Sequence, residues 1–172
     1  MCFAKIDNET LLTITSICAV FLSVVSIIIT IVFSRLQVIH NKKSVRPISA
    51  IQLMDYEDDI GAKVKNVGTG PLMITRLYFK ELDTDTKEYS VLLDMMPKIA
   101  QYWATYVECV DGWTIPIGGE IVLIELHPEN DYIKDLVRKS LTKITAYIEY
   151  TDIYGTKFQD ERSFGFFGRH YY

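Results

Sequence analysis

The stretch from Thr10 to Ser34, TLLTITSICAVFLSVVSIIITIVFS, contains no charged side chain. At about 1.5 Å per residue, an α-helix of this length crosses a hydrocarbon core about 30 Å thick. A cleaved secretory signal has a basic start, a shorter apolar stretch and a small-residue cleavage site. Here residues 1–9 are slightly acidic and the apolar stretch is too long. The sequence therefore predicts one retained transmembrane helix over residues 10–34.

The charges that flank this segment predict its orientation. Lys5 is the only basic side chain before it, whereas four follow it closely: Arg35, Lys42, Lys43 and Arg46. Because Lys and Arg are retained on the cytoplasmic side, we expect residues 1–9 outside the plasma (inner) membrane and the C-terminal domain, residues 47–172, in the cytoplasm. We expect the four basic side chains to lie against anionic lipid headgroups. They belong to residues 35–46, a helical continuation or short linker that ends before Pro47.

Residues 47–172 are enough for one domain with its own core. Short runs of strand-like composition alternate with turns rich in Gly, Pro, Asn and Asp. The strands expected from these runs are 62–65, 72–82, 88–93, 102–110, 120–126, 144–151 and about 156–164. We also expect a short helix opened by Pro97, and a second helix to about Leu141. This second helix is capped by Asn130 or Asp131 and has Tyr132, Leu136 and Leu141 on one side. The pattern indicates a mainly β fold, either a β-sandwich or a small closed barrel, with one or two short helices.

Residues that could carry chemistry are scattered along the chain. No His or Cys has a second ligand at a metal-ligand spacing, and the acidic run Asp55–Asp59 lacks the spacing of a calcium loop, which indicates a solvated turn. Cys109 lies alone in an apolar run and is expected to be a buried, inert thiol, so no disulfide can form within the domain. Nucleotide-binding loops, hydrolase elbows and kinase motifs are missing from the sequence. These observations predict a protein without catalytic residues, metal or cofactor, and the net charge of −4 argues against DNA or RNA binding.

Small side chains recur at spacings of three and four inside the apolar segment. They are Ser16, Ala19, Ser23, Ser26 and Thr30. Such a stripe lines one helix face and lets a partner helix approach closely, which favours self-association. In the alternative interpretation, each hydroxyl only bonds the carbonyl four residues back in its own helix.

The chain ends on an aromatic stretch, residues 164–172, FGFFGRHYY. If this stretch is exposed, it is a contact surface for a partner or for the membrane. Its candidate contact residues are Phe166, Phe167, Arg169, Tyr171 and Tyr172. If it is buried, it is the last strand that closes the core, and we expect Phe164 and Phe166 to be buried with the final residues at an edge.

Four turn motifs together resemble a family. They are Asn66–Pro71 before an apolar strand, Pro116–Glu120, Tyr150–Gly155 and Phe167–His170. Over most of the chain they resemble uncharacterised bacterial single-span membrane proteins with a C-terminal immunoglobulin-like β domain. A looser resemblance is to membrane effectors of bacterial antiphage systems, some of which sense a cyclic oligonucleotide through a small β-barrel and disrupt the membrane. Those effectors commonly have two spans, and none of their ligand-binding residues can be matched here.

These features predict a non-enzymatic, membrane-anchored interaction or sensing module that self-assembles through its transmembrane helix. In its sharper form, a nucleotide-type or protein trigger binds the domain, and the assembled helices disturb the bilayer as part of antiphage defence. The alternative is a structural or accessory subunit, in which the helix packs against a larger membrane protein. An enzyme with a dispersed site is a third possibility. The expected partners are the lipid bilayer and either further copies of the chain or another membrane protein.

Overall fold

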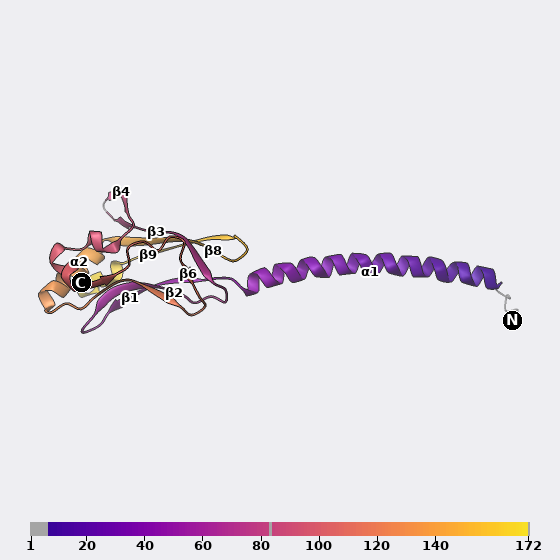
Figure 1. The fold of residues 1–172 in the computed structure, drawn as a ribbon, viewed down its shortest axis with the longest axis horizontal. Coiled ribbons are helices and arrows are strands. Elements are labelled where there is room, and N and C mark those ends of the chain that lie inside the picture. The colour runs from indigo at the N-terminus through magenta and orange to yellow at the C-terminus, as the bar shows by residue number, and fades with distance from the viewer. Residues whose placement is uncertain (1–6, 83, 172) are drawn as a thin grey trace. The chain divides into compact units, whose positions relative to one another are not determined.

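The computed structural model of the chain describes residues 7–82 and 84–171. The chain divides between Lys43 and Ser44 into two compact units. The first is dominated by helix α1 (Asn8–Ser44; Figure 1), whose 37 residues span about 55 Å at 1.5 Å each. No residue of Asn8–Ser44 is buried, and large apolar side chains such as Phe21 and Phe33 are about two-thirds exposed (68% and 67%). The predicted helix is therefore present, and it continues ten residues beyond Ser34.

The second unit contains two antiparallel sheets. The first has the order β1-β2-β7-β5, formed by β1 (Ser49–Asp55), β2 (Ile60–Asn66), β7 (Glu120–Leu126) and β5 (Ala104–Tyr106). The second has the order β4-β3-β8-β9, formed by β4 (Thr84–Tyr89), β3 (Leu72–Glu81), β8 (Ile144–Thr151) and β9 (Lys157–Ser163). The two-residue strand β6 (Thr114–Ile115) pairs with the start of β3. The predicted mainly β fold is confirmed.

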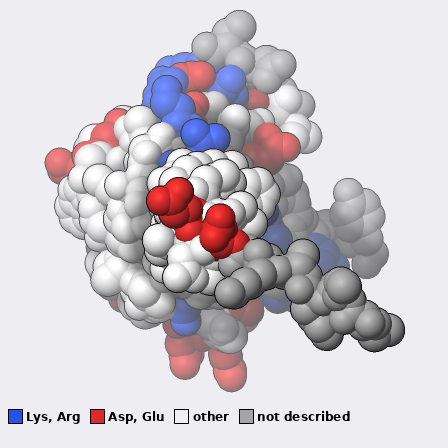
Figure 2. All heavy atoms as spheres, turned by 90° about the vertical axis from the view of Figure 1, so that its right-hand side faces the viewer, with Lys and Arg blue, Asp and Glu red and all other residues white. Residues whose placement is uncertain are grey.

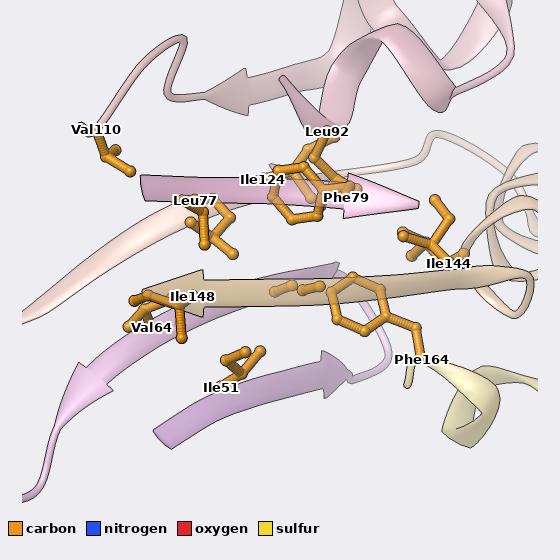
Figure 3. Packing of buried hydrophobic residues seen from close by; sticks show 14 of the residues in the cluster. Ile51, Val64, Leu77, Phe79, Leu92, Val110, Ile124, Ile144, Ile148 and Phe164 are labelled. Atoms are coloured by element: carbon orange, nitrogen blue, oxygen red, sulfur yellow. The ribbon is translucent and has the colours of Figure 1, made fainter. Parts of the chain in front are cut away.

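The sheets lie face to face and enclose one apolar core. On β8 every second residue from Ile144 to Tyr150 is buried, which is the period of a strand with one face inward. Figure 3 shows residues of both sheets together in this core, among them Ile51 and Val64 of the first sheet and Leu77 and Ile148 of the second. The arrangement is a β-sandwich.

The strands at residues 60–66, 72–81, 120–126, 144–151 and 157–163 confirm the corresponding predictions. Strand β1 was not predicted, although its buried residues Ser49 and Ile51 alternate with the less buried Ala50 and Gln52. The long strand predicted over 102–110 was wrong, because only Ala104–Tyr106 pairs with β7. Beyond it the chain crosses to the other sheet, where the Ile74 amide donates to the Trp113 carbonyl (2.8 Å), and a crossing segment cannot remain in one ladder. The arm predicted over 88–93 begins earlier, as β4, and turns at Leu92–Met95 into the short 3₁₀ helix η1.

Three further helical segments lie at one end of the sandwich, opposite the end where β1 begins (Figure 1). They are η2 (Lys98–Trp103), α2 (Asp131–Leu141) and η3 (Gly165–Tyr171), and we call this the helical end. The cap predicted for α2 is confirmed, since the Asn130 side chain accepts a hydrogen bond from the Ile133 amide (2.9 Å). The predicted packed face was wrong for Tyr132, which is 72% exposed.

The opposite end of the sandwich carries the chain that follows α1 and the loops between strands. Its segments are residues 45–48, 67–71, 113–119 and 153–157, which we call the linker end. Because β1 starts here and β2 ends here, antiparallel pairing brings the β2–β3, β6–β7 and β8–β9 connections to the same end.

Candidate functional site

Helix α1 is the first candidate site, because its apolar surface has no protein cover. Among the described residues it is the one helix long and apolar enough to cross a membrane. Figure 2, a view along α1, shows uncharged side chains around the helix and acidic side chains near the end that faces the viewer. Exposed apolar side chains continue past Ser34 to Leu36, Val38 and Ile39.

The small-residue stripe lies on one face of α1, and its hydroxyl groups bond within the helix. Ser16, Ser23, Ser26 and Thr30 each donate to the carbonyl four residues back, at 2.8–2.9 Å. Thr13, outside the stripe, makes the same bond. These bonds occupy the hydroxyl protons but leave the oxygen lone pairs and the small volume of Ser and Ala, so close approach by a second helix remains sterically open.

The basic side chains that follow the apolar segment fall in both units. Arg35, Lys42 and Lys43 are exposed on α1, and the last two belong to its final turn, where cations favour the helix dipole. Arg46 belongs to the sandwich, where its guanidinium lies 4.9 Å from the centre of the Phe158 ring. The four residues are therefore not one continuous patch on one element.

The C-terminal aromatic stretch folds as η3 rather than as a final strand. Phe164 and Phe167 are fully buried, so Phe167 is not available as a contact residue. Phe166 is 41% exposed, which makes the expectation of its burial wrong. The cause is the helical turn of η3, which sends residues 164 and 167 to the same side. The side chain of Tyr171 and all of Tyr172 lie outside the described residues.

Arg169 connects η3 to the edge of the first sheet. Its guanidinium lies 3.8 Å from the centre of the Phe166 ring and bonds an Asp55 carboxylate oxygen at 3.2 Å. Phe166 also lines a hollow of about 560 Å³ beside β1, the edge strand of the first sheet, together with Arg162 and Lys63. Phe166 and Arg169 are thus two residues of the aromatic stretch whose side chains are partly exposed.

Asp55 is the centre of an ion cluster that the sequence interpretation missed. Its carboxylate is fully buried and accepts hydrogen bonds from Nε and Nη2 of Arg138 (2.7–3.2 Å). It also pairs with Nη2 of Arg169. The partners are 83 and 114 residues away in sequence. No local spacing could have indicated them; the available signal was an acidic residue at the end of a strand.

The acidic turn after Asp55 is held by a buried lysine and is not simply solvated. Lys134 is 6% exposed, and its ammonium group donates to the carbonyls of Tyr56 and Glu57. A positive charge therefore already lies against this turn. Within residues 7–82 and 84–171, no group of three or more His, Cys, Asp or Glu side chains could hold a metal ion.

Cys109 differs from its prediction. The structure places it on the surface, in the segment that crosses between the sheets, as a free thiol. It is therefore accessible to reagents, and the apolar run around it does not bury it.

Comparison with protein-family models, curated proteins and solved structures finds no match to this chain.

Proposed function

We propose that this chain is a membrane-anchored interaction module that assembles through α1. The observation that carries the proposal is that α1 is apolar and uncovered along its length, while the sandwich has a core to which α1 contributes nothing. A helix with this surface is stable in a bilayer, where its backbone groups are satisfied internally. The basic residues on its C-terminal side support a cytoplasmic sandwich domain at the plasma membrane.

The stripe of small residues supports self-association of α1. Helices in a membrane associate by close packing, because lipid is as apolar as the side chains it replaces. Large side chains cover the opposite face of α1, so an approaching helix comes nearest along the stripe. In the sharper form of the proposal, a nucleotide-type or protein trigger leads the assembly to disrupt the membrane in antiphage defence. The support for this form is the resemblance to such effectors.

An immunoglobulin-like topology is part of the proposal. In chain order, the sheets β1-β2-β7-β5 and β4-β3-β8-β9 correspond to strands A-B-E-D facing C′-C-F-G, with α2 between E and F. Domains of this architecture are commonly recognition modules, which supports interaction rather than catalysis as the role of the sandwich; that step is an analogy of fold.

Substitution of the stripe tests self-association. Changing Ser16, Ala19, Ser23 and Ser26 to Leu should shift the full-length protein in detergent or nanodiscs from oligomer to monomer, because bulk at these positions holds helices apart. The matched control changes Ile17, Phe21, Val24 and Ile28 on the opposite face to Leu and should leave the oligomer unchanged. Equal oligomer size in all three proteins would contradict self-association through this face.

The alternative function is an accessory subunit of a larger membrane complex. The hollow beside β1, lined by Phe166 and Arg162, favours it, because an open sheet edge next to an exposed aromatic ring can receive a segment of another protein. Crosslinking in cells distinguishes the two functions. A stoichiometric heterologous partner supports the accessory role, and recovery of self-crosslinks alone contradicts it.

A further inference from the structure

The linker end of the sandwich exposes a group of large apolar side chains on its loops. Ile48, Val67, Trp113, Ile117, Ile153 and Tyr154 are between 46% and 62% exposed. They come from four segments that antiparallel pairing brings to one end of the domain. Apolar residues at the tips of turns contribute nothing to the core, so their presence here requires another explanation.

Buried polar side chains hold these loops in place. The Asn66 side chain is fully buried and donates to the carbonyls of Gly70 (2.8 Å), Ile115 (3.1 Å) and Pro116 (3.3 Å). Its oxygen accepts from the amides of Gly68 (3.0 Å) and Ile48 (3.5 Å). The Asn66 side-chain amide is thus hydrogen-bonded to three of the four segments, residues 45–48, 67–71 and 113–119.

The fourth segment has its own support. The Asp152 carboxylate, on a residue only 3% exposed, accepts from the amides of Tyr154 and Thr156, both at 2.8 Å. This fixes the turn that presents Ile153 and Tyr154. The apolar tips therefore belong to a preformed surface, which loses little conformational entropy when it is covered.

The charge of this surface differs from that of the rest of the domain. The four segments contain Arg46 and Lys157 but no Asp or Glu. Residues 45–172 as a whole carry 14 basic and 20 acidic side chains. An acidic domain is repelled by an anionic membrane surface, and the four linker-end segments themselves add no acidic side chain to that repulsion.

Chain length places the linker end near the bilayer. The exposed apolar surface of α1 reaches Ile39. Beyond the predicted span, which ends at Ser34, helical residues 35–44 add about 15 Å and the four residues 45–48 at most about 14 Å before β1 begins, so the linker is long enough to turn back to the bilayer. The headgroup region on each side of the hydrocarbon core is about 5–8 Å deep. The loops therefore lie within reach of it.

We propose that the linker end is a lipid-docking surface, whose apolar loop tips enter the headgroup region of the bilayer that holds α1. Trp and Tyr favour that depth, because their rings are apolar and their N–H or O–H groups remain hydrated. Arg46 and Lys157 meet the lipid phosphates. Docking would fix the orientation of the sandwich on the membrane and direct the helical end, with Phe166 and Arg169, toward the cytoplasm. The inference rests on the proposed anchoring of α1.

The test uses the full chain in liposomes that contain lipid brominated near the headgroup. Trp103→Phe leaves Trp113 as the single tryptophan, at the linker end. Trp113→Phe leaves Trp103, whose backbone ends η2 at the helical end. We expect the Trp113 emission to shift to the blue and to be quenched by the brominated lipid, while the Trp103 emission is unchanged.

A charge substitution shows whether the apolar tips cause the contact. In the Trp103→Phe background, Ile117→Asp combined with Ile153→Asp should relieve the quenching of Trp113. Both positions are more than half exposed, so the fold should persist, and circular dichroism checks this. The matched control is Tyr132→Asp, which is also more than half exposed but lies at the helical end, and it should leave the quenching intact.

Flotation of the same liposomes separates the two proposals. Protein that floats while Trp113 remains unquenched overturns docking and leaves the anchor intact; protein that does not float overturns both. Equal quenching of Trp113 and Trp103 overturns a docking surface confined to the linker end. If the Trp113 emission shifts to the blue without being quenched, and the shift increases with the protein-to-lipid ratio, a second copy of the chain covers the loops. This result also overturns the proposal.

Discussion

At the residue scale, the Asp55 cluster shows how the C-terminus is held to the sandwich. The buried carboxylate is shared by Arg138 on α2 and Arg169 on η3. Both arginines remain partly exposed, at 19% and 39% of the side chain, so solvent weakens each pair. Removing one partner from such a cluster is destabilising, because it leaves the remaining charges without compensation.

Asp55→Asn should lower the free energy of unfolding by about 2 kcal/mol, since the amide retains the size of the carboxylate but loses its charge. Urea unfolding of the full chain in detergent, followed by tryptophan emission, measures this, because both tryptophans lie in the sandwich unit. The control is Glu120→Gln, which breaks the more exposed pair with Lys63 (3.0 Å) and should cost about 0.5 kcal/mol or less. An equal decrease in the free energy of unfolding in the two variants would show that the buried cluster stabilises the domain no more than the exposed pair does.

Asn66 and Asn130 differ in whether the amide nitrogen donates, and this gives a second residue-scale prediction. Asn66 donates to three carbonyls, whereas the hydrogen bond of Asn130 in the α2 cap is accepted by its oxygen. Asn66→Asp removes the donors, places a carboxylate against carbonyl oxygens and should cost about 3 kcal/mol or more.

Asn130→Asp should be nearly neutral, because Asn and Asp cap helices about equally well. The same urea experiment compares these two isosteric changes. A loss of less than about 1 kcal/mol in Asn66→Asp would show that the linker-end loops do not depend on this amide.

At the element scale, local pattern predicted most of the long strands but missed β1, although β1 pairs with β2 along its full length. Strand β8 alternates strictly, and β7 is apolar on both faces as a central strand between β2 and β5. Residues 102–110 have an equally strand-like composition, but the chain must cross from one sheet to the other there. Tertiary connection overrides propensity at such a crossing, and local sequence does not contain that information.

The face of α2 is the clearest case of an ambiguous local signal. Tyr132 and Leu136 are one helical turn apart, but so are Ile133, Val137 and Leu141, and the second set continues for a further turn. The structure buries the second set. The longer set was the better signal, because it provides an apolar contact along the whole helix.

Truncation on the two faces of α2 tests this assignment. Leu141→Ala removes a fully buried side chain and should cost about 2–5 kcal/mol, since it leaves a cavity in the core. Tyr132→Ala, at 72% exposure, should change stability by about 0.5 kcal/mol or less. Thermal unfolding followed by near-ultraviolet circular dichroism compares them. A larger loss of stability in Tyr132→Ala than in Leu141→Ala would show that α2 packs through the face expected from the sequence.

At the scale of the whole molecule, sequence predicted the division into an apolar helix and a β domain, because each depends on a long, local pattern. The Asp55 cluster and the linker-end surface could not be predicted in this way. Each joins segments far apart in the chain, and the exposed Ile117 and Ile153 lie in turns that carry no periodic signal. Apolar residues beside turn glycines were the available indication of such a surface.

Orientation in the membrane is the whole-molecule property with the most direct test. Four basic side chains follow the apolar segment and one precedes it, so the sandwich should be cytoplasmic. Cys109 is an exposed thiol on that domain and reports its location without an introduced label site. In a Cys2→Ser variant expressed in bacterial spheroplasts, a membrane-impermeant maleimide should label the chain only after permeabilisation. Cys109→Ser in the same background should abolish that labelling, since the remaining Cys18 lies within the membrane segment. Labelling of Cys109 in intact spheroplasts would place the sandwich outside and invert the proposed topology.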